Sequence, residues 1–258
     1  MIISDNLIKF AYKNVIVEKQ LNIAEYLDST YLKTADEAGI TELENNKIIL
    51  QVIDEAISNK FACVMIRPDF VLMAIERINF FKSKIKVGTV VDFPFGDSDT
   101  SSKLKEAKVA IDNGAFDIDF VCDYNAFKRK SFEKFDLDIL EGTKKCLENK
   151  KIAKWIIETG ALSKNEIKEI SRRISKIVYM NFPKSIDKVF IKTSTGYYGG
   201  YGATVRDVKL IKSESRDLKI KASGGISNFT DAFQLIQAGA DRIGTSKAKL
   251  IYDQQKKY

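Results

Sequence analysis

The chain has 258 residues, 45% hydrophobic and 30% charged, with 14 glycines, 3 prolines and a formal net charge of +7. These values exclude a disordered, collagen-like or disulfide-rich protein and fit one large domain or two small ones. No uncharged stretch approaches the ~18 residues of a membrane helix, and Asp5 lies where a signal peptide would be apolar. We therefore expect a cytoplasmic protein that does not contact a membrane.

Short β-rich runs alternate with longer amphipathic stretches along the whole chain. The predicted strands, in order, are Glu25–Leu27, Phe61–Ile66, Lys86–Val91, Phe116–Val121, Lys154–Glu158, Lys188–Lys192, Leu218–Ala222 and Asp241–Gly244. Apolar residues three and four positions apart predict the helices between them. Examples are Ile49, Ile53, Ala56 and Ile57; Leu104, Ala107 and Ile111, ending at Gly114; Ile167, Ile170 and Ile174; and 231–238, ending at Gly239.

Eight strand–helix alternations without a linker predict a closed (β/α)8 barrel, an α/β fold of the TIM-barrel type. We expect one domain over 1–258, with a partly helical N-terminal extension at 1–22 and a flexible tail at 252–258. A doubly wound open sheet is the alternative, but it usually carries a glycine-rich phosphate loop after its first strand. Here the glycines cluster late, at 196–202, 224–225 and 244, as in barrels that bind phosphate after strands 7 and 8.

Residue types restrict the chemistry. Histidine is absent, and the three cysteines show no metal-binding spacing. A histidine-dependent triad or histidine-ligated metal centre is impossible, so acid–base chemistry must use carboxylates, lysines or tyrosines. The positive charge is typical of a lysine-rich solvated surface and is also compatible with an anionic partner. Because the basic residues are spread out and not interleaved with aromatic residues, we expect no nucleic-acid binding.

Three charged residues occupy predicted strands near the rim where barrel active sites form. Asp119 has apolar neighbours in its strand, and Lys192 and Lys221 close two consecutive strands. Two lysines ~6 Å apart at an effective dielectric constant of ~20 repel by about 2.8 kcal/mol, or roughly 2 pKa units. Such a shift produces the neutral amine that Schiff-base chemistry needs. Each residue alone could simply emerge into solvent.

Several segments, in order over nearly the whole chain, resemble deoxyribose-phosphate aldolases, which are class I aldolases with a (β/α)8 barrel. They are residues 27–30 (LDST), 89–96 (TVVDFPFG), 106–119, 156–160 (IIETG), 191–196 (IKTSTG), 202–208, 221–226 (KASGGI), 231–232, 238–240 and 242–246 (RIGTS). The pairing of KTSTG with KASGG is highly specific. The resemblance implies cleavage of 2-deoxy-D-ribose 5-phosphate to D-glyceraldehyde 3-phosphate and acetaldehyde, in both directions, without metal or organic cofactor.

The resemblance also implies roles for individual residues. Lys192 is then the Schiff-base lysine, Lys221 the lysine that lowers its pKa, and Asp119 the carboxylate that relays protons with Lys221 through water. The implied phosphate-binding residues are Gly196, Gly224, Gly225, Gly244 and Ser246, with Lys247 as an added charge, and the implied substrate-binding residues are Asp28 and Thr193. We further expect Tyr258, at the end of the tail, to help protonate the enamine.

Two other functions remain open at this stage. One is a lysine-dependent aldolase that acts on a different phosphorylated sugar. The other is a barrel that binds a sugar phosphate without catalysis, although phosphate binding alone would require neither the two lysines nor Asp119. The partner in each case is a small phosphorylated sugar, and we expect a homo-oligomer, a dimer or larger.

Overall fold

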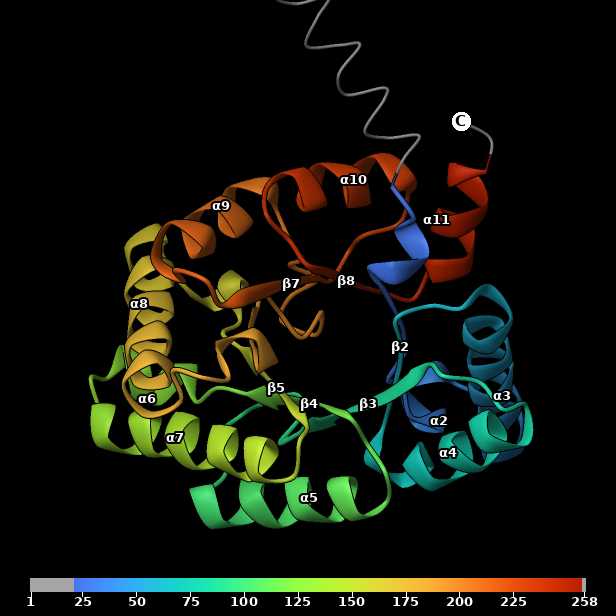
Figure 1. The fold of residues 1–258 in the computed structure, drawn as a ribbon, viewed down its shortest axis with the longest axis horizontal. Coiled ribbons are helices and arrows are strands. Elements are labelled where there is room, and N and C mark those ends of the chain that lie inside the picture. Colours follow the sequence, from blue (N-terminus) through green and yellow to red (C-terminus); the bar gives the residue numbers. More distant parts are fainter. Residues whose placement is uncertain (1–20, 257–258) are drawn as a thin grey trace, which may run out of the picture.

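Eight parallel strands pair in chain order and close into a barrel in the computed structural model, which describes residues 21–256 (Figure 1). The strands are β1 Leu27–Tyr31, β2 Cys63–Ile66, β3 Lys86–Val91, β4 Asp117–Val121, β5 Ile152–Ile156, β6 Val189–Lys192, β7 Lys219–Ser223 and β8 Arg242–Thr245. β1 also pairs with β8, which completes the ring. The predicted (β/α)8 barrel is confirmed.

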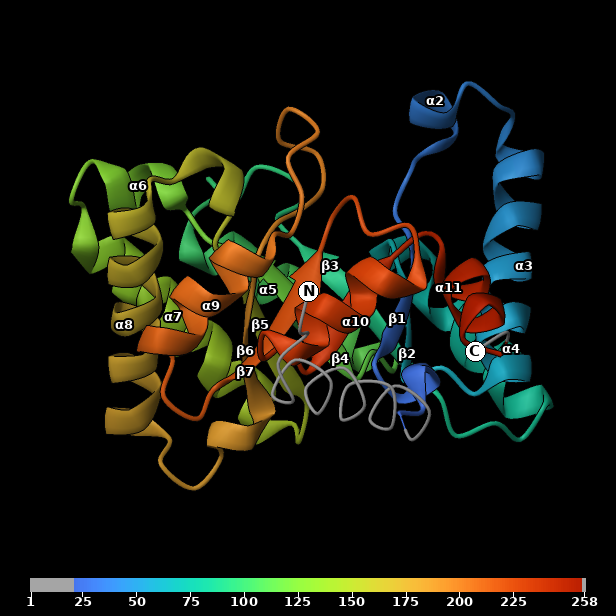
Figure 2. The ribbon, with the colours of Figure 1, turned by 90° about the horizontal axis from the view of Figure 1, so that it is seen from above.

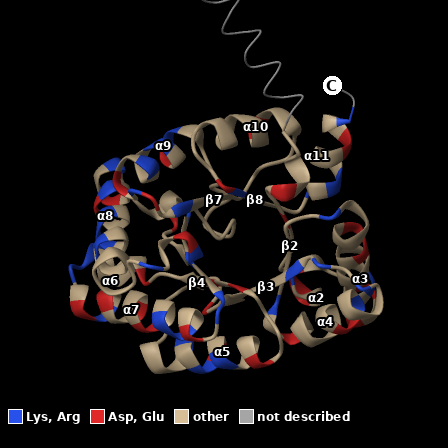
Figure 3. Ribbon diagram, viewed as in Figure 1, with Lys and Arg blue, Asp and Glu red and all other residues tan. Residues whose placement is uncertain are grey.

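Helices surround the strands. They are α2 Ala35–Ala38, α3 Glu42–Asn59, α4 Val71–Phe80, α5 Thr100–Asp112, α6 Tyr124–Lys128, α7 Phe132–Glu148, α8 Lys164–Asn181, α9 Val205–Glu214, α10 Phe229–Gln237 and α11 Ala248–Gln255. Figure 2 shows α2 and the loop between β6 and α9 projecting from the same end of the barrel. Acidic and basic positions are interspersed along the outer helices (Figure 3). Within residues 21–256, no helix is both long and apolar enough to cross a membrane.

Local sequence signals fix where the helices begin. Thr41 and Glu44 form a reciprocal capping box at α3, and Ser163 and Glu166 form the same arrangement at α8. Each satisfies backbone N–H groups that have no partner inside the first helical turn. At the C-terminal end of α5, Gly114 follows the last turn with a φ of 102°, as its place in the sequence predicts.

Five predicted strands, those that correspond to β3, β4, β6, β7 and β8, agree with the structure to within one residue at each end, and β2 begins two residues later than predicted. The first strand was placed wrongly, because Ile23–Glu25 forms a 3-10 turn and β1 begins at Leu27. The fifth was placed two residues late, since Glu158 has left the strand with a φ of 54°. The start of the predicted flexible tail is helical: α11 continues to Gln255, whose side chain accepts a hydrogen bond from Ile23 N.

The core lies mainly between the strands and the helix ring. Trp155 on β5 is fully buried and stacks on Phe120 of β4, with ring centroids 4.7 Å apart. Its indole N–H donates to Thr143 on α7. Gly142 on α7 lies against the same indole, and an added Cβ there would be 2.7 Å from Cη2 of Trp155. A glycine therefore lets this helix approach the barrel closely.

This contact yields a stability prediction. Gly142→Val should lower the free energy of unfolding by about 2–3 kcal/mol, because the added side chain overpacks against a rigid ring. Lys144→Val, at an exposed position on the same helix, is the matched control and should change it by less than about 1 kcal/mol. Urea denaturation followed by circular dichroism measures both. Equal midpoints for the two variants would contradict the packing argument.

Candidate active site

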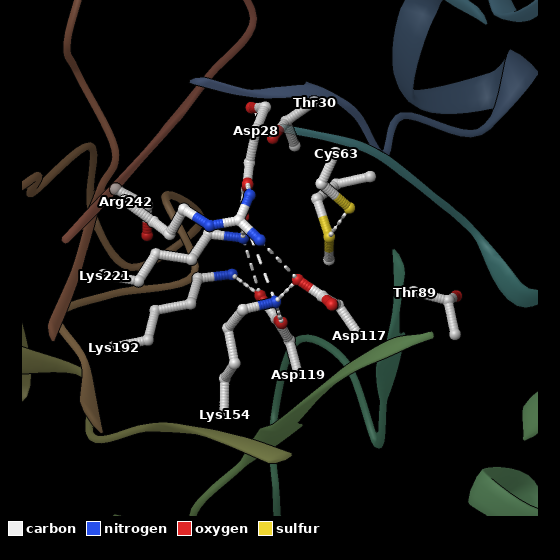
Figure 4. Close-up of polar contacts among 12 residues, drawn as sticks. Asp28, Thr30, Cys63, Thr89, Asp117, Asp119, Lys154, Lys192, Lys221 and Arg242 are labelled. Atoms are coloured by element: carbon white, nitrogen blue, oxygen red, sulfur yellow. Dashed lines mark hydrogen bonds and ion pairs between the residues drawn. The ribbon is translucent and has the colours of Figure 1, made fainter. Parts of the chain in front are cut away.

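Charged side chains from six strands meet inside the barrel (Figure 4). They are Asp28 on β1, Asp117 and Asp119 on β4, Lys154 on β5, Lys192 on β6, Lys221 on β7 and Arg242 on β8. Six of these residues are at most 3% exposed, and the Arg242 side chain is 13% exposed. Ions removed from water are strongly destabilised unless oppositely charged groups surround them. The contacts within this network therefore decide which groups can stay charged.

Asp119 contacts three lysines, and these four residues form the upper part of the network. Its Oδ2 lies 2.9 Å from Nζ of Lys192 and 2.9 Å from Nζ of Lys221, and its Oδ1 lies 3.0 Å from Nζ of Lys154. Lys192 and Lys221 are direct partners in the pairing of β6 with β7, so register places them side by side. The structure thus brings together the three residues expected to carry the chemistry. Asp119 and Lys221 touch directly, whereas the resemblance implies a water between them.

The lower part of the network consists of Asp28, Asp117 and Arg242. Lys154 and Lys221 join it to the upper part. Lys154 lies 2.5 Å from Asp117 and 3.9 Å from Asp28. Lys221 lies 2.7 Å from Asp28. Arg242 contacts both carboxylates, at 2.6 Å from Asp28 and 3.3 Å from Asp117. These contacts join all seven residues into one network of four basic and three acidic side chains.

Lys192 is the most weakly compensated cation of this network. Its one carboxylate contact is with an oxygen of Asp119 that also receives Lys221. Lys154, in contrast, lies within 4 Å of three carboxylates. The excess positive charge is therefore relieved most easily by loss of the Lys192 proton.

The pKa shifts follow these contacts. Burial, together with the Lys221 and Lys154 cations, lowers the pKa of Lys192 to about 8, although Asp119 acts in the opposite direction. Burial acts to raise the pKa of Asp119, but the three lysines outweigh it and hold that pKa well below its ordinary value. Burial also disfavours the charged form of Lys154, yet the three carboxylates raise its pKa. The site combines a permanently ionised carboxylate with a lysine that titrates near neutrality.

Lys154, Asp117 and Arg242 are not among the site residues predicted from the sequence. Asp117 could have been found, because it lies two residues before Asp119 and alternate residues of a strand share a face. Lys154 was placed at the start of its predicted strand, but it lies in the middle of β5 between apolar neighbours. Arg242 carries no local signal, since its partners are contributed by β1 and β4.

Glycines at the ends of β6 and β7 form an exposed backbone surface above the two lysines. Gly196 and Gly224 lie close together, since a Cβ added to Gly196 would be 3.7 Å from Cα of Gly224. Gly225 follows with a φ of 72° and is exposed. The carbonyl of Gly224 accepts a hydrogen bond from Ala203 N, which fixes the next loop against it. Backbone N–H groups in glycine-rich loops of this kind can bind an anionic group.

The expected phosphate-binding residues in and after β8 differ in exposure. Ser246 and Lys247 are exposed at the start of α11, where Lys247 N donates to Thr245 Oγ1. Gly244 is buried inside β8, and an added Cβ would lie 2.9 Å from Cε of Lys221. Gly244 therefore leaves room for the Lys221 side chain.

Two residues expected to bind substrate are already engaged. Asp28 is fully buried and paired with Lys221 and Arg242. The Thr193 hydroxyl is also fully buried; it donates to the carbonyl of Ser223 and accepts from Ser223 N. Asp28 thus belongs to the ion network and Thr193 joins the ends of β6 and β7, while the roles of both in substrate binding stay predictions. Tyr258, the expected proton donor of the tail, lies outside the described residues.

Aromatic side chains link the loop after β6 to other parts of the rim. The Tyr197 ring packs edge-on against Phe93, with centroids 4.9 Å apart, and its hydroxyl donates to Glu37 of α2. Tyr198 of the same loop packs edge-on against Tyr124 of α6. The loop after β6 thus contacts both α2 and α6.

One group of buried ligand atoms resembles a metal site. Asp28, Cys63 and Asp117 each place a ligand atom within 4.8 Å of the others. Burial and the two carboxylates raise the pKa of the Cys63 thiol well above its ordinary value, so the thiol stays protonated. Lys154 and Arg242 already contact both carboxylates. This donor set therefore does not fit a metal ion.

Comparison with known proteins agrees with this geometry. No family model matches the chain. The deoxyribose-phosphate aldolase of Clostridioides difficile is 39% identical over 226 residues, which span 87% of this chain and 93% of that protein. A solved aldolase superposes with a TM-score of 0.75 at 32% identity, over 92% of this chain and 97% of its own.

A deoxyribose-phosphate aldolase from Aeropyrum pernix, described as a tetramer, superposes with a TM-score of 0.74 over 95% of this chain and 97% of its own. At 23% identity this match shows the fold. The similarity to the Clostridioides difficile enzyme is higher and extends over almost the full length of both chains. The protein therefore belongs to the deoxyribose-phosphate aldolase family.

Proposed function

We propose that this protein cleaves 2-deoxy-D-ribose 5-phosphate to D-glyceraldehyde 3-phosphate and acetaldehyde, reversibly, through an imine on Lys192. The observation that carries the proposal is the position of Lys192: a buried amine with one shared carboxylate contact and a pKa lowered to about 8. About one molecule in ten then holds the neutral amine at pH 7, far more than for a free lysine. The Schiff-base pathway needs this neutral form.

The reaction divides into steps that the network can assist. The neutral amine of Lys192 attacks C1 of the open-chain sugar, and loss of water gives the iminium. The C2–C3 bond then breaks, its electron pair moves toward the iminium nitrogen, and the C3 hydroxyl loses its proton as the aldehyde forms. The remaining enamine is protonated on carbon and hydrolysed to acetaldehyde. Asp119 contacts both Lys192 and Lys221, so Asp119 and Lys221 are placed to exchange these protons.

The glycine surface supports a phosphorylated substrate. Gly196, Gly224 and Gly225 are close to the ends of the strands that carry both lysines, and Lys247, two residues after the end of β8, is exposed. Backbone N–H groups in such loops bind anions well. Binding energy from the phosphate can then orient the reacting carbons. The same chemistry would suit another phosphorylated sugar, so a comparison of substrates is needed to separate deoxyribose 5-phosphate from other sugar phosphates.

Other expectations remain predictions. They include the proton donation by Tyr258, the cytoplasmic location and the absence of nucleic-acid binding. The homo-oligomer also remains a prediction; Leu72, Phe80 and Phe81 are exposed apolar residues of α4 and its end, where a second copy could pack. Light scattering coupled to size-exclusion chromatography measures the mass in solution.

The nucleophile is tested by trapping. Borohydride reduction in the presence of acetaldehyde should leave a covalent adduct that peptide mass mapping locates at Lys192. Lys192→Arg keeps the positive charge but cannot form the imine, so its turnover should fall below about 1% of wild type. Lys188→Arg, at an exposed position near the start of the same strand, is the control and should retain activity. An adduct on another lysine would contradict the assignment.

The pH dependence follows from the lowered pKa. Because the neutral amine reacts, kcat/KM should rise with pH and level off above about 8. The Lys221 cation lowers the pKa of Lys192, so Lys221→Leu should move this rise to higher pH and reduce turnover at pH 7. Steady-state rates between pH 6 and pH 10 measure both effects. A profile that stays in place in the variant would contradict the electrostatic role of Lys221.

Phosphate recognition is tested with a truncated substrate. Deoxyribose without its phosphate should lose about 100-fold or more in kcat/KM, because the anion no longer contributes binding energy to the transition state. Progress curves for the two sugars, and for other phosphorylated aldoses, give the comparison. Equal efficiency with and without phosphate would rule out the anion site. A higher efficiency with another sugar phosphate would reassign the substrate.

A further inference from the structure

Arg242 is buried deep in the barrel and has no place in the steps described above. Its guanidinium lies 2.6 Å from Asp28 and 3.3 Å from Asp117, and the reacting amine of Lys192 is bonded to neither of these carboxylates (Figure 4). The two carboxylates hold the arginine in its charged form and raise its pKa, although burial opposes this. An arginine is therefore a permanent positive charge in this network.

This permanent charge changes the balance of the network. Without Arg242, the three lysines would be matched by the three carboxylates, and all three lysines could stay protonated. Arg242 adds a fourth positive charge that occupies Asp28 and Asp117. One lysine must then lose its proton for the buried network to be neutral, and Lys192 has the fewest carboxylate contacts.

Asp117 acts on the same balance with the opposite sign. Its carboxylate lies 2.5 Å from Lys154 and 3.3 Å from Arg242. Without this negative charge, Lys154 and Arg242 would be less well compensated, and the excess positive charge would increase. Loss of the proton from Lys192 would then become still more favourable.

Further charged and titratable groups face the two ends of this network. Lys192 faces Asp119 from β4, Lys154 from β5 and Lys221 from β7. Glu158, just after β5, also interacts with it, and burial raises the pKa of that carboxyl. Arg242 faces Asp28, Asp117, Asp119 and the protonated thiol of Cys63 on β2.

We propose that Arg242 and Asp117 are positioning residues that together set the pH at which Lys192 becomes a nucleophile, although neither contacts it. The proposal rests on the imine-forming role proposed for Lys192. It assigns the lower part of the network a function in catalysis beyond stability. It also predicts opposite effects from removing the two charges, which a merely structural role does not.

The test measures how imine formation depends on pH. The purified protein is incubated with acetaldehyde and cyanoborohydride at a series of pH values, and the adduct on Lys192 is quantified by peptide mass mapping. Arg242→Met should shift the midpoint of trapping upward by about one pH unit, the effect of a unit charge within ~10 Å at an effective dielectric constant of ~20. Asp117→Asn should shift the midpoint downward by a similar amount and increase trapping at pH 7.

Two further variants serve as controls. Arg242→Lys keeps the charge and should keep the midpoint near that of wild type. The double variant Asp117→Asn/Arg242→Met removes one charge of each sign, so its midpoint should return toward the wild-type value. Circular dichroism establishes that each variant is folded.

Each outcome has a defined meaning. Unchanged midpoints in both single variants, or shifts in the same direction, would overturn the proposal. If Arg242→Met does not fold, Asp117→Asn decides alone, and a midpoint that fails to fall overturns it. An absence of any Lys192 adduct in the wild-type protein would instead refute the proposed function on which the inference rests.

Discussion

Four basic and three acidic side chains share the interior of this barrel, and their unequal number governs the site. Burying an ion costs several kcal/mol, which is recovered only when close partners replace the lost water. Lys154 has three carboxylates within 4 Å, whereas Lys192 shares a single carboxylate oxygen with Lys221. The reactive amine is thus the position where the network can most easily give up a charge. Its lowered pKa is a property of the whole arrangement.

The fold produces this arrangement through strand register. Parallel pairing sets Lys192 beside Lys221 and Lys221 beside Arg242, so three cations come from three consecutive strands. The carboxylates come from β4 and from β1, which closes the ring against β8. A glycine at position 244 leaves room for the Lys221 side chain between these strands. Small changes of register would therefore separate charges that are now within contact.

Much of the fold follows from local patterns in the sequence. The alternation of apolar runs and amphipathic stretches predicted the barrel, and β3 has the predicted boundaries, because the five residues after Lys86 are all buried and mostly apolar. The first strand was misplaced because Glu25, where it was expected to begin, ends a 3-10 turn, and because the polar residues Asp28 and Ser29 of β1 are buried. Hydrophobicity alone cannot identify a strand whose inward residues are charged.

The site was predictable only in part. Asp119, Lys192 and Lys221 stand out because they are charged residues near the ends of apolar strands. Lys154 and Arg242 are equally charged, but their significance depends on carboxylates from non-neighbouring strands. Thr193, whose part in substrate binding is implied by the family resemblance, has a hydroxyl that is hydrogen-bonded to the backbone of Ser223. Contacts across a barrel arise from closure of the sheet, which no local pattern records.

The central claim is that Lys192 gives up its proton near neutrality. Carbon-13 NMR of protein labelled at the lysine ε-carbons reports the charge of each amine directly as pH is varied. The account predicts one resonance that titrates near pH 8, is absent from the Lys192→Arg variant and shifts when acetaldehyde forms the imine. A Lys192 resonance that stays in its charged form up to pH 10, or a resonance near pH 8 that belongs to another lysine, would contradict it.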